Sequence, residues 1–221
     1  MDPILPDSLT DYLDALLPER PAYMRAMEAY AVEQSFPIIG PQAGRYLAQM
    51  AAIQKPARIF EMGSGFGYSA CWLLAGAPDA HIVCTDTSED HADKARDWLT
   101  EAGIWEHVDF CVGDALELLR ESEERFDLIY NDVDKEAYPD VFTLSLERLA
   151  PGGLLISDNV LWSGRVADDT VRDEATEAIR AYNRLMFTTP GVESVIVPIR
   201  DGLGVTRRIQ GVVHGGDGCA Q

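Results

Sequence analysis

The chain has 221 residues, of which 47% are hydrophobic, so it is long enough to form one globular domain with a substantial core. Its 37 acidic residues outnumber 18 basic ones, and the resulting net charge of −19 repels phosphate backbones and disfavours a nucleic-acid substrate. No apolar run approaches the roughly 18 residues that span a bilayer, and no signal peptide is recognisable, so we expect a cytoplasmic protein without a membrane partner.

Helices are predicted for the N-terminal quarter of the chain. Apolar residues recur at helical spacing in three segments between residues 7 and 54, and prolines separate these segments.

From residue 57 onward, short apolar runs alternate with amphipathic stretches, which predicts a parallel sheet with helices on both faces. The predicted strands are Arg58–Met62, His81–Asp86, Val108–Val112, Phe126–Asp132 and Gly153–Ser157. The predicted helices lie at about 67–76, 88–102, 114–121, 138–149 and 170–188. The runs Val192–Val197 and Gly204–Ile209 look like a closing hairpin, and we expect the glycine-rich tail from 211 to 221 to be loose.

The cysteines and histidines fall at no disulfide or metal-ligand spacing. The four cysteines are widely separated and form no CxxC pair, and the four histidines are equally scattered. Neither a disulfide framework nor a zinc site is therefore predicted.

The first predicted strand runs directly into a glycine-rich turn that reads EMGSGFG. Glycines permit a tight strand-to-helix turn and a close approach of the backbone to a ligand. A dinucleotide fingerprint would need a glycine where Tyr68 stands, which disfavours a nicotinamide-dependent dehydrogenase. Glu61, two residues before the first glycine, is placed to meet a ligand with positive charge. The sulfonium and ammonium of S-adenosylmethionine fit that requirement better than a phosphate-bearing cofactor does.

Two further acids follow the next two predicted strands. Asp86 ends the second strand, where a carboxylate can accept both ribose hydroxyls, and Asp114 follows the third. Either aspartate alone is equally consistent with a helix N-cap. Three acids at three successive strand ends favour a cofactor site, and an aspartate can cap a helix and bind a ligand at once.

The fourth and fifth predicted strands also end in polar residues. Asp132 ends the fourth, and Asp158 and Asn159 follow the fifth. If these strands are neighbours, their ends lie about 5 Å apart. Two carboxylates and an amide oxygen suit magnesium, manganese or calcium rather than zinc. The alternative is that these polar residues only open the turns after the strands. For Asp134, three roles stay open: a further metal ligand, a partner of the ligands, or a solvated surface residue.

Lys135 lies three residues after Asp132 in a chain that has only three lysines. A nearby cation favours the neutral form of a lysine, which then can accept a proton. Without such a cation, a lone lysine in a loop is a surface residue. We predict that Lys135 is a general base.

Three segments, EMGSGFGYSA, NDVDKEAY and SDNVLWSGRV, together resemble the cation-dependent O-methyltransferase family, which includes catechol and caffeoyl-CoA O-methyltransferases. The resemblance extends from the N-terminal helices, through Gly40-Pro41-Gln42, to the segment 198–203, and so covers nearly the whole chain. It implies a class I methyltransferase fold of the α/β class, with a doubly wound, seven-stranded, mostly parallel sheet, an antiparallel last strand and an N-terminal helical extension. It also implies a homodimer.

The resemblance assigns a role to each candidate site residue. The metal ligands are Asp132, Asp158 and Asn159, the base is Lys135, and Trp162 lies near the substrate pocket. The residues that hold S-adenosylmethionine are Glu61, Gly63, Ser69, Asp86, Asp114 and Asp132. Two positions depart from the family pattern, since Val133 replaces the usual alanine and Asn131 stands where an apolar residue is more common.

The chain is therefore expected to be a single methyltransferase domain over residues 1–221. Residues 1–54 form a substrate and dimer region, 57–210 the cofactor-binding core and 211–221 the loose tail. The hypothesis is a metal-dependent O-methyltransferase acting on a small catechol-like or hydroxylated aromatic acceptor. The alternatives are a tRNA hydroxyuridine O-methyltransferase, which the net charge disfavours, and a non-catalytic nucleotide-binding module.

Acceptor selection is expected to depend on the N-terminal helices, on residues 162–168 and on a partner subunit. Four arginines could meet an anionic acceptor such as a coenzyme A ester, or could equally form surface ion pairs: Arg20, Arg25, Arg45 and Arg165.

Overall fold

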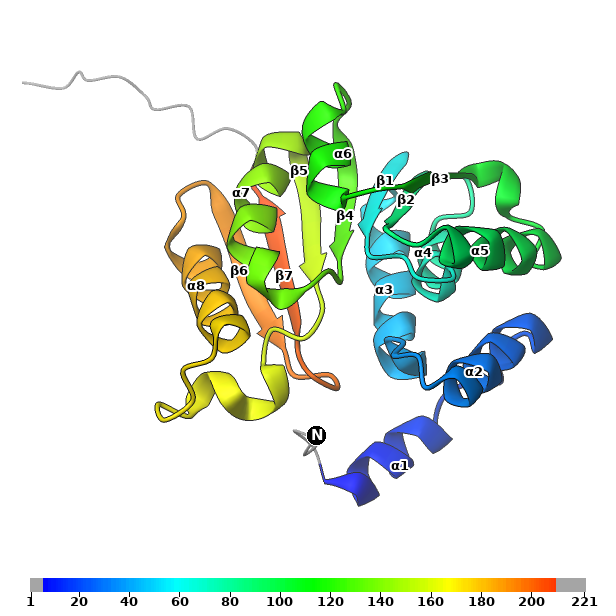
Figure 1. The fold of residues 1–221 in the computed structure, drawn as a ribbon, viewed down its shortest axis with the longest axis horizontal. Coiled ribbons are helices and arrows are strands. Elements are labelled where there is room, and N and C mark those ends of the chain that lie inside the picture. The colour runs from blue at the N-terminus through cyan, green and yellow to red at the C-terminus, as the bar shows by residue number, and fades with distance from the viewer. Residues whose placement is uncertain (1–5, 210–221) are drawn as a thin grey trace, which may run out of the picture.

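Seven strands form one twisted sheet at the centre of the structure, with helices on both of its faces (Figure 1). The structure is a computed structural model that describes residues 6–209. The strands are β1 Arg58–Met62, β2 His81–Asp86, β3 Val108–Val112, β4 Phe126–Asn131, β5 Leu149–Ser157, β6 Val192–Val197 and β7 Leu203–Arg208. The helices are α1 Asp7–Ala15, α2 Ala22–Gln34, α3 Gly40–Gln54, α4 Tyr68–Gly76, α5 Glu89–Glu101, α6 Ala115–Glu121, α7 Tyr138–Arg148 and α8 Glu174–Thr188. Short 3-10 turns lie at η1 Trp105–His107, η2 Lys135–Ala137 and η3 Trp162–Ala167.

The strand order is β3-β2-β1-β4-β5-β7-β6. Strands β1 to β5 pair in parallel, whereas β7 runs antiparallel to both β5 and β6. The predicted doubly wound sheet with an antiparallel last strand is thus confirmed. The strand order reverses between β1 and β4, and open parallel sheets bind ligands above such a point.

Alternating side chains of the strands build two separate cores. One face of β1 and β4, with Ile59 and Leu128, packs beneath α2, α3, α4 and α5. The other face, with Phe60 and Ile129, packs against α6, α7 and α8. This period-two division explains why the strands read as nearly continuous apolar runs in the sequence.

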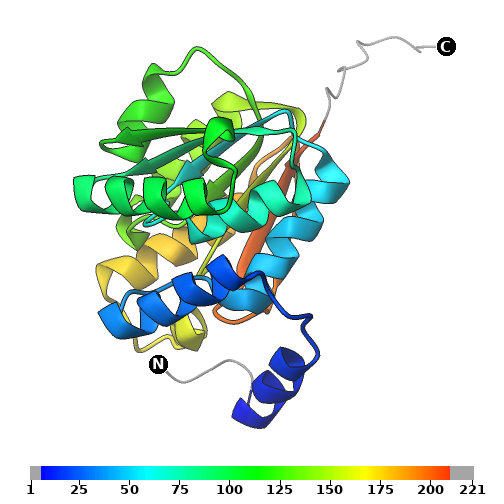
Figure 2. The same ribbon diagram turned by 90° about the vertical axis from the view of Figure 1, so that its right-hand side faces the viewer.

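Helix α1 lies apart from this layered body. Figure 2 shows it below α2 and α3, at the edge of the molecule. The Gln42 side chain of α3 ties it down by donating to the carbonyl oxygen of Thr10 at 3.3 Å and to Oδ1 of Asp14 at 2.8 Å. No helix in the described range 6–209 has the length and hydropathy to cross a membrane.

The predicted element bounds differ from the structure in a few places. Strand β5 begins four residues earlier than predicted, because Leu149 already pairs with Phe126 and the following Pro-Gly-Gly is absorbed as a shift in register. Helix α8 begins at Glu174 rather than near 170, because Asp173 caps it by accepting from the backbone N–H of Thr176. The predicted loose tail lies outside the described residues.

Two glycines allow α3 and α4 to pack closely beside the sheet. A Cβ atom on Gly76 would lie 2.0 Å from the carbonyl oxygen of Ala48, and one on Gly44 would lie 2.2 Å from Nε1 of Trp72. Neither position has room for a methyl group. The contact holds α4, and with it the glycine turn that precedes α4, against the N-terminal helices.

We therefore expect Gly76→Ala to lower the free energy of unfolding by about 1–3 kcal/mol, because the added methyl group meets backbone rather than a movable side chain. Urea unfolding followed by circular dichroism would measure the change. Ala52→Ser, on the exposed side of α3, is the control and should stay within about 0.5 kcal/mol of the parent. Equal stability of the two variants would contradict this account of the packing.

Candidate functional site

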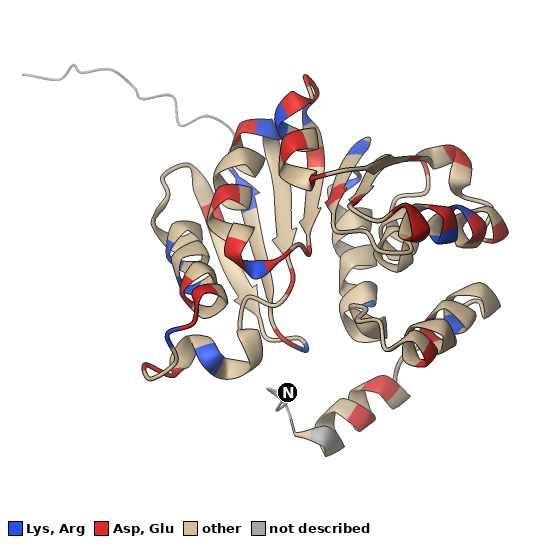
Figure 3. Ribbon diagram, in the orientation of Figure 1, with Lys and Arg blue, Asp and Glu red and all other residues tan. Residues whose placement is uncertain are grey.

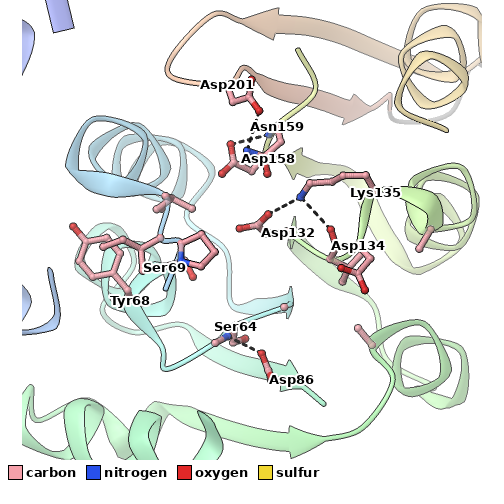
Figure 4. Close-up of a pocket in the computed structure, with 18 of the residues that line it drawn as sticks. Ser64, Tyr68, Ser69, Asp86, Asp132, Asp134, Lys135, Asp158, Asn159 and Asp201 are labelled. Carbon is pink, nitrogen blue, oxygen red and sulfur yellow. Dashed lines mark hydrogen bonds and ion pairs between the residues drawn. The ribbon is translucent and has the colours of Figure 1, made fainter. Parts of the chain in front are cut away.

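A cavity of about 950 Å³ opens at the carboxyl ends of the parallel strands, at the point where the strand order reverses. Its wall is formed by the glycine turn, by the loops that follow β2 to β5, and by residues of the N-terminal segments and of the β6–β7 loop. Figure 4 shows two ends of this cavity, with Ser64 and Asp86 at one end and Asp132, Lys135, Asp158, Asn159 and Asp201 at the other.

The glycine turn connects these two ends. Gly63, Gly65 and Gly67 all adopt positive φ angles, of 79°, 51° and 88°, which residues with a Cβ rarely tolerate. A Cβ atom on Gly63 would lie 2.4 Å from the carbonyl oxygen of Asp132. The turn therefore rests directly on the end of β4.

Glu61 lies behind the cavity wall rather than on it. Its side chain is fully buried and is not among the groups that line the cavity. Burial raises the pKa of Glu61. Its Oε2 accepts from Sγ of Cys84 at 3.2 Å, and its Oε1 is buried without a hydrogen-bond partner among the described residues. Ser64 and Ser69 do line the cavity. A ligand would meet these two serines, and Glu61 stands behind them.

Asp86 organises the glycine turn. Its carboxylate accepts from the backbone N–H groups of Gly65 at 3.0 Å and Ser88 at 2.9 Å, and it contacts Nδ1 of His91 at 2.9 Å. The cap of α5 is Ser88, which accepts from the N–H of His91. The N-cap alternative is therefore wrong for Asp86, which lines the cavity instead.

Asp114 does cap a helix. Its side chain accepts from the backbone N–H of Glu117 at 2.9 Å at the start of α6, and it also lines the cavity. The two interpretations of Asp114 are compatible, because a carboxylate has acceptor sites to spare.

At the other end, the parallel pairing of β4 and β5 brings Asp132, Asp158 and Asn159 together. The register places Asn131 opposite Ser157, so the residues that follow leave the sheet side by side. Asp158 is 3% exposed. Burial and then the charge of Asp132 raise the pKa of Asp158. Two carboxylates that disfavour each other's charge in this way are relieved by a bound cation.

Asn159 completes an oxygen-rich donor set. Its Nδ2 donates to Oδ2 of Asp201 at 3.4 Å, which leaves the amide oxygen without a donor among the described residues. Within residues 6–209, no cluster of three or more His, Cys, Asp and Glu side chains is arranged to hold a metal. Two carboxylates and one amide are instead what the site offers, and such oxygen donors fit a hard divalent cation.

Lys135 lies beside these carboxylates at the start of η2. Its Nζ donates to Oδ1 of Asp132 at 3.0 Å, to the carbonyl oxygen of Val133 at 3.1 Å and to the hydroxyl of Tyr138 at 3.1 Å. It also lies 5.9 Å from the centre of the Trp162 ring. All three N–H groups of the ammonium are used, so the lysine is held firmly in one place.

Sequence reasoning missed the part played by Tyr138. This fully buried side chain accepts from Lys135 and donates to the carbonyl oxygen of Asp158 at 2.8 Å. It thereby joins the loop after β4 to the loop after β5. Its spacing of three residues from Lys135, one helical turn, was the available signal.

Asp201 was missed as well. Besides contacting Asn159, its carboxylate accepts from the backbone N–H of Ser163. This bond holds a strained segment in which Trp162, Ser163 and Gly164 have φ angles of 47°, 54° and 76°. Trp162 lines the cavity.

Three of the four arginines proposed for an anionic acceptor are engaged elsewhere. Arg20 pairs with Glu28, Arg25 with Glu19 and Arg165 with Asp173. Arg45 is exposed, and none of the four lines the cavity. The cavity wall has instead Arg200, which sequence reasoning did not single out.

Comparison with known proteins places this geometry in context. A family model described as "O-methyltransferase" matches residues 19–209. A catechol O-methyltransferase of Niastella koreensis is 27% identical over 198 residues, covering 86% of this chain and 90% of that relative.

Two solved structures share the fold. The O-methyltransferase from Bacillus cereus, solved in complex with SAH, superposes with a TM-score of 0.83 at 28% identity, covering 91% of this chain and 97% of its own. The O-methyltransferase TomG from Streptomyces achromogenes, solved in complex with SAM, gives a TM-score of 0.81 at 26% identity, covering 91% and 96%.

The burial of Asp158 predicts a specific pH dependence of stability. Burial and the charge of Asp132 raise its pKa to about 7, so the folded state binds this proton more tightly than the unfolded state does. Its contribution is fully present below about pH 4 and falls as the pH rises to about 7, by a few kcal/mol at most.

The neutral variant Asp158→Asn should remove that slope, and at pH 8 without metal it should be more stable than the parent. Urea unfolding between pH 4.5 and 8 in a chelating buffer would measure both proteins. The difference between them isolates Asp158 from the other titrating groups. Parallel profiles for the two proteins would contradict the assignment.

Proposed function

The chain belongs to the O-methyltransferase family and is an S-adenosylmethionine-dependent O-methyltransferase, and we propose that it methylates one hydroxyl of a small catechol-like or hydroxylated aromatic acceptor with the help of a divalent cation. The observation that carries this proposal is the position of Asp132, Asp158 and Asn159 beside Lys135, in the same cavity as the glycine turn. The methyl donor and the acceptor would then bind in one cavity.

Asp132, Asp158 and Asn159 would hold the cation, and magnesium fits their oxygen donors best, with manganese and calcium as alternatives. A cation bound there supplies positive charge that lowers the pKa of an acceptor hydroxyl. The chain itself supplies the arrangement, because Tyr138 ties the two ligand-bearing loops together.

Lys135 would accept the proton of the acceptor hydroxyl. In the structure it is an ammonium paired with Asp132. A cation held at Asp132 would favour the neutral amine of Lys135, which the carbonyl oxygen of Val133 and the hydroxyl of Tyr138 would keep in place. Once the proton has moved to Nζ, the acceptor oxygen attacks the sulfonium methyl in line, and the thioether leaves with the bonding electrons. The enzyme contributes mainly orientation.

S-adenosylmethionine would lie against the turn and the strand ends, contacting Gly63, Ser69, Asp86, Asp114 and Asp132. All five of these residues line the cavity. Glu61 would act indirectly, through its charge, from a buried position behind the serines that meet the donor. This arrangement would still bring the carboxylate of Glu61 near a cationic ligand, with the two serines between them.

The charge distribution disfavours transfer RNA as the acceptor. Figure 3 shows acidic residues on most helices and basic residues scattered among them. With a net charge of −19, a nucleic acid would have to approach against the field of the whole protein. A non-catalytic role has no support from the site, because every proposed ligand and the base are present together.

We place acceptor and subunit contacts on residues 1–54 and donor binding on residues 57–210. Around α1, Leu9, Tyr12 and Leu16 are 41%, 60% and 62% exposed. Three exposed apolar side chains on and directly after one short helix are the kind of surface that a second copy of the chain covers. A homodimer would therefore seat α1 against its partner.

Replacing Lys135 with alanine should lower kcat by about 10²–10⁴-fold, because the general base is lost. Affinity for S-adenosylmethionine, measured by calorimetry, should change little. Lys135→Arg keeps a positive charge but is a poor base, and it should be almost as inactive. Substantial turnover by the arginine variant would show that Lys135 acts only through its charge.

Methyl transfer to a 3,4-dihydroxyphenyl acceptor should disappear on addition of excess chelator and return with magnesium. Asp158→Asn should raise the magnesium concentration for half-maximal activity at least about tenfold, since a charged ligand is lost. Asp134→Asn, on the neighbouring loop after β4 and exposed, removes a carboxylate from the same cavity wall and is the matched control, which should behave like the parent. Transfer that persists in chelator would refute metal dependence.

A further inference from the structure

Only two of the described residues that line the cavity carry a positive charge, Lys135 and Arg200. The ammonium of Lys135 has no free N–H group, because its three donors bind Asp132, Val133 and Tyr138. Arg200 uses one of its five N–H donors, from Nη1 to the carbonyl oxygen of Ile38 at 2.7 Å. No other hydrogen bond joins its guanidinium to the described part of the chain. Arg200 is thus the cation on this wall that can still bind a ligand.

The backbone of Arg200 is held in an unfavourable conformation. Its φ angle is 51°, in the left-handed region that glycine occupies readily and branched or long side chains avoid. The neighbouring Gly202, with φ of 87°, shows that this loop uses glycine where it needs that conformation. An arginine at such a position has a cost in stability, so its side chain needs a compensating role.

Arg200 belongs to the acceptor end of the cavity. It directly precedes Asp201, whose carboxylate contacts Asn159. Burial raises the pKa of Asp201, and the positive charge of Arg200 is one of the influences that oppose this rise. The guanidinium also lies against Gly40 at the start of α3, where a Cβ atom would be 3.4 Å from its central carbon. The group therefore sits between the β6–β7 loop and the start of α3.

We propose that Arg200 binds a carboxylate carried by the acceptor, so that the preferred acceptor is an aromatic carboxylic acid with vicinal hydroxyls. This inference rests on the proposed function, because it takes the hydroxyl end of the acceptor to lie at Asp132, Asp158 and Asn159. The planar guanidinium matches a carboxylate with two parallel hydrogen bonds. The acids around the site strengthen the requirement, since an anionic acceptor would be repelled there without a direct partner.

A purely structural role for Arg200 is the rival explanation. Its bond to Ile38 links the β6–β7 loop to the segment before α3. Such a link would affect all acceptors alike, whereas a carboxylate partner would affect only charged ones. The two explanations therefore differ in how they treat a charged acceptor and its neutral counterpart.

The test compares 3,4-dihydroxybenzoate with its methyl ester, which has the same ring and hydroxyls but no charge. Binding of each to the protein saturated with S-adenosylhomocysteine and magnesium is measured by calorimetry, and methyl transfer by kcat/KM. For the parent protein we expect the acid to bind at least about tenfold more tightly than the ester. Arg200→Gln should abolish that preference, and Arg200→Lys should restore part of it.

Arg200→Gly guards against misfolding, because glycine adopts the required backbone conformation without strain. Arg45→Gln, an exposed arginine that does not line the cavity, is the control and should keep the preference for the acid. A dihydroxycinnamoyl thioester of coenzyme A is the third ligand, since its phosphates are an alternative source of negative charge.

The outcomes separate this inference from the proposed function. Loss of the acid-over-ester preference in Arg200→Gln and Arg200→Gly, with the Arg45→Gln control intact, supports the assignment. Equal binding of acid and ester by the parent, binding of neither, or an effect of Arg200→Gln confined to the thioester would each overturn it. Methyl transfer to the ester with no preference for the acid would leave the proposed function standing and refute the role of Arg200 alone.

Discussion

The parallel register between β4 and β5 is the constraint on which the end of the cavity around Asp132 and Asp158 depends. Asn131 lies opposite Ser157, one residue before the residues that leave the sheet. The buried amide of Asn131 donates to Oγ of Ser157 at 3.2 Å, and that hydroxyl lies 2.6 Å from the hydroxyl of Tyr182. A shift of one residue in this register would leave these buried polar groups without hydrogen-bond partners, and each such group costs about 1–3 kcal/mol of stability. Asn131, which departs from the family pattern, thus helps to fix the register that brings the two loops together.

Much of the fold could be predicted from the sequence because burial on both faces gives strands a plain signature. The bounds of β1, β2 and β3 agree with the prediction, and each of these strands is an apolar run that ends in a turn. The start of β5 could not be predicted, because Pro-Gly-Gly is read locally as a turn, and only its pairing with β4 extends the strand through it. Local sequence signals a break, whereas the neighbouring strand decides whether pairing continues.

The sequence predicted which residues stand at the strand ends of the candidate site, but not the direction in which their side chains point. Period two places Glu61 on the same face of β1 as Ile59, which packs beneath α2, α3, α4 and α5. This explains why Glu61 is buried behind the cavity wall. The arginines illustrate a different limit. Arg20 and Arg165 lie eight residues before their acidic partners, whereas Arg200 contacts Ile38 across 162 residues of chain. The first kind of pairing leaves a trace in the local sequence, and the second depends on the whole fold.

The contact between Gly63 and the carbonyl oxygen of Asp132 has a consequence for how this protein can diverge. Because the glycine turn and the loop after β4 touch through backbone, neither can move without displacing the other. A substitution that moves the backbone in one half of the cavity must therefore be accompanied by a compensating substitution in the other half. Sequence changes in the two halves should be correlated among relatives. New acceptor specificities are then most accessible at the rim, in the segments around Trp162, Arg200 and α1, where side chains can change while this shared backbone contact stays fixed.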